Sequence, residues 1–141
     1  MNFLLATNVV SEWVKPRPNP GVITWLAGAD EDRIFLSVIT LGELRHGIER
    51  MADGARRKRL EVWLRDELPL RFEGRIAAID AKIADAWGKL LARGEAAGRP
   101  LGTVDALIAA TASVGGMSLV TRNTADFQAW LPAIVNPWVE I

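Results

Sequence analysis

The sequence predicts an α/β protein in which a doubly wound parallel sheet of four to five strands has helices on both faces. Short apolar runs of strand length alternate along the chain with longer segments that have helical periodicity. The chain has 141 residues, of which 50% are hydrophobic, so it can bury a substantial core. We therefore expect a single domain spanning residues 1–141.

The expected strands are short apolar runs that end close to polar residues. They are Asn2–Ala6, Ile34–Val38, Arg75–Ile79, Met117–Thr121 and, as an additional fifth, Ala133–Val135. Runs of this length without polar alternation are typical of strands that are buried on both faces of a parallel sheet.

The segments between these strands are expected to be largely helical. Apolar spacing predicts helices over Gly21–Gly28, Thr40–Met51, Arg56–Pro69, Asp80–Gly94 and Val104–Val114, with a short first helix within Val9–Val14. The residues Thr40-Leu41-Gly42-Glu43 match a capping box, and Thr103 is a plausible N-cap. Asp30–Arg33 is expected to be a polar loop.

Composition restricts the chemistry that this chain can perform. It has no cysteine, and its single histidine, His46, argues against a Ser-His-Asp triad or a multi-histidine zinc site. Its 17 basic and 17 acidic residues balance, which argues against a general DNA-coating protein. We find no secretion signal and no apolar run of membrane-spanning length, so we expect a cytoplasmic protein. Catalysis would have to depend on carboxylates.

Polar residues cluster at the predicted carboxyl ends of the strands, which is where open α/β sheets bind ligands. They are Thr7 and Asn8, then Thr40 and Glu43, then Arg122, Asn123 and Asp126, with Asp105 at the start of an otherwise apolar helix. Oxygen ligands without thiols or paired histidines favour Mg²⁺ or Mn²⁺. A cation between the carboxylates would also offset their mutual repulsion.

Each of these acids also has a purely structural interpretation. Glu43 would close the capping box, and Asp105 would complement the helix dipole. Asn123 and Asp126 would shape a turn after a strand. The coincidence of all of them on one edge favours a shared site.

Four ordered motifs resemble those of PIN-domain nucleases. They are NFLLATNVVSE at Asn2–Glu12, TLGELRHG at Thr40–Gly47, GTVDALIAATA at Gly102–Ala112 and VTRNTADF at Val120–Phe127. With the closing Asn136-Pro137-Trp138, they most resemble the VapC/FitB branch of toxin–antitoxin ribonucleases. The resemblance implies a PIN fold, Mg²⁺- or Mn²⁺-dependent cleavage of RNA, a homodimer, neutralisation by a small antitoxin, and a hetero-oligomer with that antitoxin on DNA.

The resemblance also implies roles for individual residues. Glu43 and Asp105 match metal ligands of the family. In the fourth motif the acid position corresponds either to Asn123 or to Asp126, and both alternatives remain open. The neighbouring polar residues Thr7, Asn8, Thr121 and Arg122 are candidates for supporting the site or contacting substrate.

Position 6 departs from the family pattern, because Ala6 stands where the first acid is expected. Alanine cannot coordinate a cation, so we expect this chain to be impaired as a nuclease. Either an Asp→Ala change was introduced to disarm a toxic chain, or activity was lost naturally; the otherwise intact site favours the engineered change as a hypothesis. A natural gene encoding alanine would overturn it.

Two other functions compete with the nuclease. The first is a catalytically silent PIN-fold module that binds proteins within an antitoxin/DNA-bound complex. The second is a receiver-like phosphoacceptor domain with Asp80 as acceptor, but the lysine expected after its fifth strand is missing. The basic run Arg56–Arg59 is interpreted as a solvated helix face. Trp130 does not share the helical spacing of the other apolar residues, so it is not assigned to the core.

Overall fold

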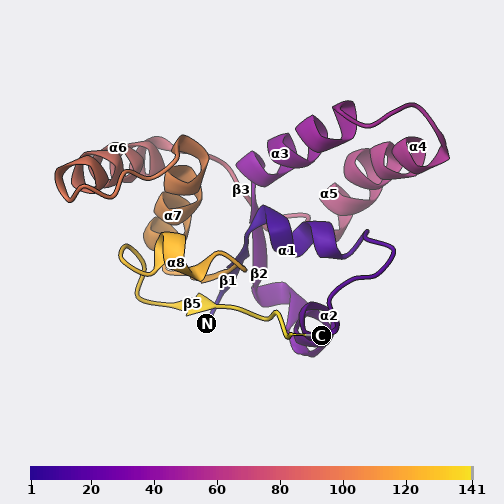
Figure 1. Cartoon of the computed structure of the whole chain (residues 1–141), viewed down its shortest axis with the longest axis horizontal. Helices are drawn as coiled ribbons and strands as arrows, with labels where there is room; N and C mark the ends of the chain where they lie inside the picture. Colours follow the sequence, from indigo (N-terminus) through magenta and orange to yellow (C-terminus); the bar gives the residue numbers. More distant parts are fainter. Residues whose placement is uncertain (141) are drawn as a thin grey trace.

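The computed structural model describes residues 1–140, which form a five-stranded parallel sheet in the order β3-β2-β1-β4-β5 (Figure 1). The strands are β1 (Phe3–Leu5), β2 (Ile34–Ser37), β3 (Ile76–Ala77), β4 (Ser118–Val120) and β5 (Ile134–Val135). In the register, Phe3 lies opposite Ile34 on one side and Ser118 on the other. This confirms the predicted parallel sheet, including its fifth strand. The strand order also differs from the 2-1-3-4-5 order of receiver-like folds, which removes that alternative.

Helices follow the strands as the alternation predicted. They are α1 (Thr7–Glu12), α2 (Pro20–Gly28), α3 (Val38–Glu49), α4 (Ala55–Val62), α5 (Leu68–Arg71), α6 (Ala81–Ala96), α7 (Thr103–Gly115) and α8 (Thr124–Phe127). A single 3₁₀ turn at Glu31–Arg33 replaces the polar loop expected there. In the part of the chain that the structure describes, no helix is both long enough and apolar enough to cross a bilayer.

The two faces of the sheet bury two separate apolar cores, because successive strand residues point to opposite sides. On one face, Leu5, Leu36 and Val120 pack with residues of α1, α2, α3 and α5. On the other face, Leu4 and Leu119 pack with residues of α6, α7 and α8. Figure 1 shows these two groups of helices on opposite sides of the strands, as the doubly wound prediction required.

The predicted helix over Arg56–Pro69 is interrupted by a π-helical segment, Trp63–Glu67, between α4 and α5. Pro69 lies in the first turn of α5. It has no N–H to donate to the preceding turn, and its ring would clash with the carbonyl of Arg65. Widening the turn at that point relieves the clash, so proline explains why one continuous α-helix was the wrong prediction.

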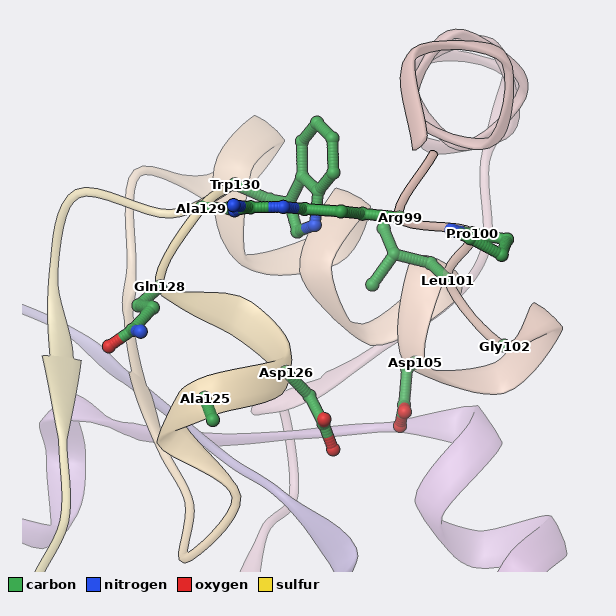
Figure 2. A pocket seen from close by; sticks show the side chains of 10 residues that line it. All are labelled: Arg99, Pro100, Leu101, Gly102, Asp105, Ala125, Asp126, Gln128, Ala129 and Trp130. Atoms are coloured by element: carbon green, nitrogen blue, oxygen red, sulfur yellow. The ribbon is translucent and has the colours of Figure 1, made fainter. Parts of the chain in front are cut away.

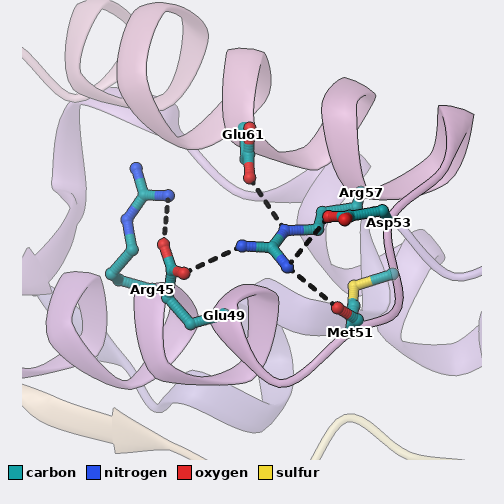
Figure 3. Close-up of polar contacts among 6 residues, drawn as sticks. All are labelled: Arg45, Glu49, Met51, Asp53, Arg57 and Glu61. Atoms are coloured by element: carbon teal, nitrogen blue, oxygen red, sulfur yellow. Dashed lines mark hydrogen bonds and ion pairs between the residues drawn. The ribbon is translucent and has the colours of Figure 1, made fainter.

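Arg57 joins α4 to α3 through several acceptors at once (Figure 3). Its guanidinium donates to Glu49 at 2.8 Å, to Glu61 at 2.9 Å and to the carbonyl of Met51 at 3.0 Å. Asp53 lies 3.4 Å away as a further ion-pair partner. At least this member of the basic run therefore has a structural role.

The helix starts differ from the predicted ones in a way that affects the site. Helix α3 begins at Val38, where the hydroxyl of Ser37 accepts a 3.1 Å hydrogen bond from the Ile39 N–H. Thr40 and Glu43 therefore lie inside α3, and the predicted capping box is wrong. Helix α7 likewise has Gly102 rather than Thr103 as its N-cap. Glu43 is thus not needed for capping.

Candidate active site

The carboxyl ends of β1 and β4, helix α3 and the first turn of α7 surround a cavity of about 310 Å³, called here the acidic cavity. Its lining residues are Ala6, Thr7, Asn8, Ser11, Glu43, Asp105, Ile108, Thr121, Asn123 and Phe127. The structure thus brings together most of the residues that the sequence singled out. Asp126 lies just outside and lines a neighbouring cleft that also contains Asp105.

Glu43 is tied to the first helix by Thr7. The Thr7 hydroxyl donates a 2.6 Å hydrogen bond to Oε1 of Glu43. The same hydroxyl lies 3.1 Å from the buried hydroxyl of Thr40, one turn before Glu43 on α3. These contacts orient an otherwise exposed carboxylate toward the cavity that it lines with Asp105.

Asn8 connects α1 to the loop after β4. Its side-chain amide donates to the hydroxyl of the buried Thr121 at 3.4 Å, and its carbonyl oxygen accepts from the Arg122 N–H at 3.5 Å. The Thr121 hydroxyl also accepts a 3.1 Å bond from the N–H of Asn123. These bonds set the position of Asn123, which is exposed at the start of α8.

Asp105 is the half-buried member of the acidic group, in the first turn of α7. Burial raises the pKa of its carboxyl above the ordinary value, and the negative charges of Asp126 and then Glu43 raise it further. The exposed carboxylates of Asp126 and Glu43 therefore lie close enough to act on the charge of Asp105.

Ala6 lies at the end of the central strand and lines the acidic cavity beside Glu43 and Asp105. Its backbone N–H donates to the Val120 carbonyl at 2.9 Å, and its own carbonyl accepts from the Val9 N–H at 3.0 Å. It is also the N-cap residue of α1, and no side chain caps that helix. The backbone at this position is thus held by main-chain bonds, and the Ala6 methyl group packs in the core that contains Leu4 and Leu119.

The donor chemistry of the site fits a hydrated hard cation. Within residues 1–140, no three acidic or histidine side chains lie close enough to enclose a metal ion. Mg²⁺ keeps several waters and needs only one or two carboxylates from the protein. Asp105, with Glu43 or Asp126 nearby, meets this requirement.

The structure also reveals site neighbours that the sequence analysis did not single out. Glu12 is only 3% exposed and accepts hydrogen bonds from Lys15 and from the Asn19 N–H. Burial alone would raise its pKa, but the bonds from Lys15 and Asn19 outweigh burial and lower it. The signal in the sequence that could have identified Glu12 is its place as an acid at the end of a short, largely apolar helix. Arg122 lies near Glu12, with its guanidinium 5.8 Å from the Trp138 ring rather than lining the acidic cavity.

Comparison with known proteins identifies the family of this chain. The family model of the PIN domain matches residues 3–129. The plasmid stability protein StbB of Pseudomonas syringae pv. tomato is 38% identical over 136 residues, which are 96% of this chain and 98% of StbB. The VapC ribonuclease Y4jK of Sinorhizobium fredii is 35% identical over 136 residues, which are 96% of this chain and 97% of its own.

A solved structure gives the same result for the fold. The structure of FitAB bound to an IR36 DNA fragment superposes with a TM-score of 0.91 at 32% identity, covering 99% of this chain and 97% of the other. The chain belongs to the PIN-domain family. Within that family it is homologous to the VapC/FitB toxins of toxin–antitoxin systems.

Proposed function

We propose that this chain is the toxin component of a type II toxin–antitoxin system whose natural activity is metal-dependent endonucleolytic cleavage of RNA. The observation that supports this most directly is the acidic cavity itself, which brings Glu43, Asp105 and position 6 to one edge of the sheet. The names of VapC relatives, which describe ribonucleases, support the choice of RNA as substrate.

In this proposal the carboxylate of Asp105 would hold Mg²⁺ or Mn²⁺ together with that of Glu43 or of Asp126, and Asn123 or bound waters would complete the coordination. Such a cation lowers the pKa of a bound water and offsets charge at the scissile phosphate. Thr7 orients Glu43 through its 2.6 Å hydrogen bond, and Asn8 and Thr121 position the loop that presents Asn123. Phosphate oxygens would approach from the open side of the cavity.

We further propose that Ala6 impairs this activity. A carboxylate at position 6 would extend from the wall that Ala6 now forms into the space shared with Glu43 and Asp105. Loss of one direct ligand weakens metal binding and transition-state stabilisation together, and costs orders of magnitude in rate. The fold does not depend on this carboxylate, because main-chain bonds hold the position.

The partners in this proposal are a cognate antitoxin, RNA and a second copy of the chain, in the cytoplasm where RNA is translated. Solved relatives include FitAB bound to a DNA fragment and a DNA-bound VapBC complex from Salmonella typhimurium. A complex of this chain with its antitoxin on DNA would follow the same pattern. The second candidate, a silent binding module, would form the same kind of complex without cleaving RNA.

The test is RNA cleavage by this chain beside its Ala6→Asp variant, each with Mn²⁺, with Mg²⁺ and with EDTA. We expect the variant to cut RNA with metal and to fail in EDTA, while the parent barely cuts. An additional Asp105→Asn change in the variant is the matched control and should abolish the cleavage. If Ala6→Asp is folded yet inert under every condition, the nuclease proposal is wrong and the binding module replaces it.

A further inference from the structure

A second cleft, of about 480 Å³, opens beside the acidic cavity and is called here the side cleft. Asp105 and Asp126 line it together, and Figure 2 shows both carboxylates directed toward the same space. One wall is the segment Arg99–Gly102 that connects α6 to α7, and the other contains Gln128 and Trp130 after α8. A polymer bound across the acidic cavity would enter this cleft next.

Arg99 has a well-defined backbone position on the first wall. Helix α6 ends with Gly98 in the left-handed conformation at φ 69°, and the Arg99 N–H donates a 2.8 Å bond to the Gly94 carbonyl. With the 3.1 Å bond from the Gly98 N–H to Glu95, this is a complete Schellman motif. A Cβ atom at Gly94 would lie 2.9 Å from the Arg99 carbonyl oxygen, so the segment packs directly on α6.

The charge of Arg99 is available to a ligand. Its side chain is exposed, and among residues 1–140 it has no ion-pair partner within 4.0 Å. Figure 2 shows it extended across the cleft toward Ala129 and Trp130. A guanidinium in this position offers a planar set of donors, which suits phosphate oxygens.

Trp130 provides the opposite wall. The backbone N–H of Trp130 donates to the Phe127 carbonyl at 2.9 Å. Phe127 is buried in the core on that face of the sheet. The indole is only partly buried against this core, so part of it remains accessible from the cleft that it lines. Accessible indole rings stack with nucleobases irrespective of base identity.

We propose that the side cleft binds a nucleotide of single-stranded RNA next to the scissile phosphate, with its base against Trp130 and its phosphate at Arg99. This inference rests on the proposed nuclease function and adds a substrate subsite to it. Two carboxylates alone would repel RNA, and the chain has no net charge. A fixed local cation and an aromatic surface beside the acids provide the attraction that the acidic cavity lacks.

The experiment measures equilibrium binding of a fluorescein-labelled, short single-stranded RNA of mixed sequence by anisotropy across a salt series. The parent chain with Ala6 is used in Mg²⁺, with gels to verify that the RNA stays intact. The variants are Arg99→Ala, Arg99→Lys, Trp130→Leu and Trp130→Phe. Arg33→Ala is the control, because Arg33 directly precedes β2 and so lies at the amino ends of the strands, whereas the side cleft lies at their carboxyl ends. Circular dichroism melting verifies that each variant is folded.

The two walls should give different signatures. Arg99→Ala should weaken binding and lower the slope of log K against log salt by about 0.7, the value for one lost contact to single-stranded phosphate. Arg99→Lys should keep most of that slope. Trp130→Leu should weaken binding about tenfold without changing the slope, whereas Trp130→Phe should retain most of the affinity. Arg33→Ala should match the parent.

Other outcomes would overturn the subsite. If the parent binds RNA and the folded Arg99→Ala and Trp130→Leu variants bind it equally well, the subsite is wrong while the nuclease proposal stands. If these variants lose affinity only for the antitoxin, the cleft is a protein interface instead. If the parent binds no RNA and Ala6→Asp cleaves none, both proposals fail together.

Discussion

The hydroxyl of Thr7 donates a 2.6 Å hydrogen bond to the carboxylate of Glu43, across 36 positions of the sequence. This bond joins the helix that follows the central strand to the helix that follows its neighbour. It holds one carboxylate in a fixed orientation at the edge where the other acids lie.

Removing the Thr7 hydroxyl should weaken metal binding without unfolding the chain. In the Ala6→Asp background we expect Thr7→Val to reduce Mn²⁺ affinity by about 10- to 100-fold, because Glu43 loses the partner that orients it. Thr7→Ser keeps the hydroxyl and should retain the affinity. Titration calorimetry measures the effect, and Thr24→Val on the exposed face of α2 is the control. Equal affinities for Val and Ser at position 7 would contradict the role assigned to the hydroxyl.

An acid at position 6 should make thermal stability depend on metal. Ala6→Asp and Ala6→Asn both provide an N-cap for α1, which has none now, and each cap contributes about 1 kcal/mol. Only the aspartate adds a charged ligand beside Asp105 and Glu43. We therefore expect Mn²⁺ to raise the melting temperature of Ala6→Asp clearly more than that of Ala6→Asn or the parent.

Differential scanning fluorimetry with and without Mn²⁺ measures this difference, and EDTA should reverse it. An equal metal-induced shift in the Asp and Asn variants would show that position 6 contributes capping and not coordination.

The Asp105 carboxyl should make metal-free stability fall as pH rises. Its pKa in the folded chain is raised by burial and by Asp126 and Glu43, whereas in the unfolded chain it is about 3.9. The folded state therefore binds more protons than the unfolded state between the two values, so this group lowers the free energy of unfolding as pH increases through that window. Above the folded-state pKa the full penalty is present.

Asp105→Asn removes that penalty. In EDTA the variant should melt at a higher temperature than the parent at pH 7, and the gain should disappear below the unfolded-state pKa. Melting curves from pH 3 to pH 8 test this. The control is Asp85→Asn, because the side chain of Asp85 on α6 is exposed. A gain that is independent of pH would exclude the charge as its cause.

Arg57 should stabilise the α3–α4 pair in a salt-dependent way. Arg57→Ala removes bonds to Glu49, Glu61 and the Met51 carbonyl. It leaves Glu61 and Asp53 without their cation, whereas Glu49 keeps its ion pair with Arg45 (Figure 3). We expect a lower melting temperature, with a smaller difference from the parent in 1 M salt, where the ion pairs of the parent are screened. Arg65→Ala removes only an exposed pair with the adjacent Asp66 and should have little effect. Equal losses in the two variants would contradict a network role for Arg57.

The sheet could be predicted from the sequence because its strands are short and continuously apolar. Such runs are typical of strands that are buried on both faces of a parallel sheet. The errors came from local signals that competed with the real ones. Thr40 and Glu43 have the spacing of a capping box, yet Ser37 caps the helix, because β2 passes into α3 without a loop. Pro69 interrupts a helix whose apolar spacing continues past it.

The grouping of Glu43, Asp105 and Asp126 could be predicted because each belongs to a helix that begins at one edge of the sheet, although their roles stay predictions. The sequence also named Thr7, Asn8 and Thr121 as supporting candidates, but it did not predict the bonds that they make. Thr121 accepts bonds from Asn8, and Arg99 faces Trp130, only because distant segments meet in three dimensions. Such contacts depend on how α6, α7 and α8 pack, which local sequence patterns do not specify.

Main-chain bonds hold the backbone of position 6 at the end of the central strand, where the Ala6 methyl group packs in the core that contains Leu4 and Leu119. The same position lines the acidic cavity, so its side chain belongs to the core and to the cavity wall at once. In the proposed nuclease, one codon at this boundary would change the donor set of the cavity while the main-chain bonds that carry it stay the same.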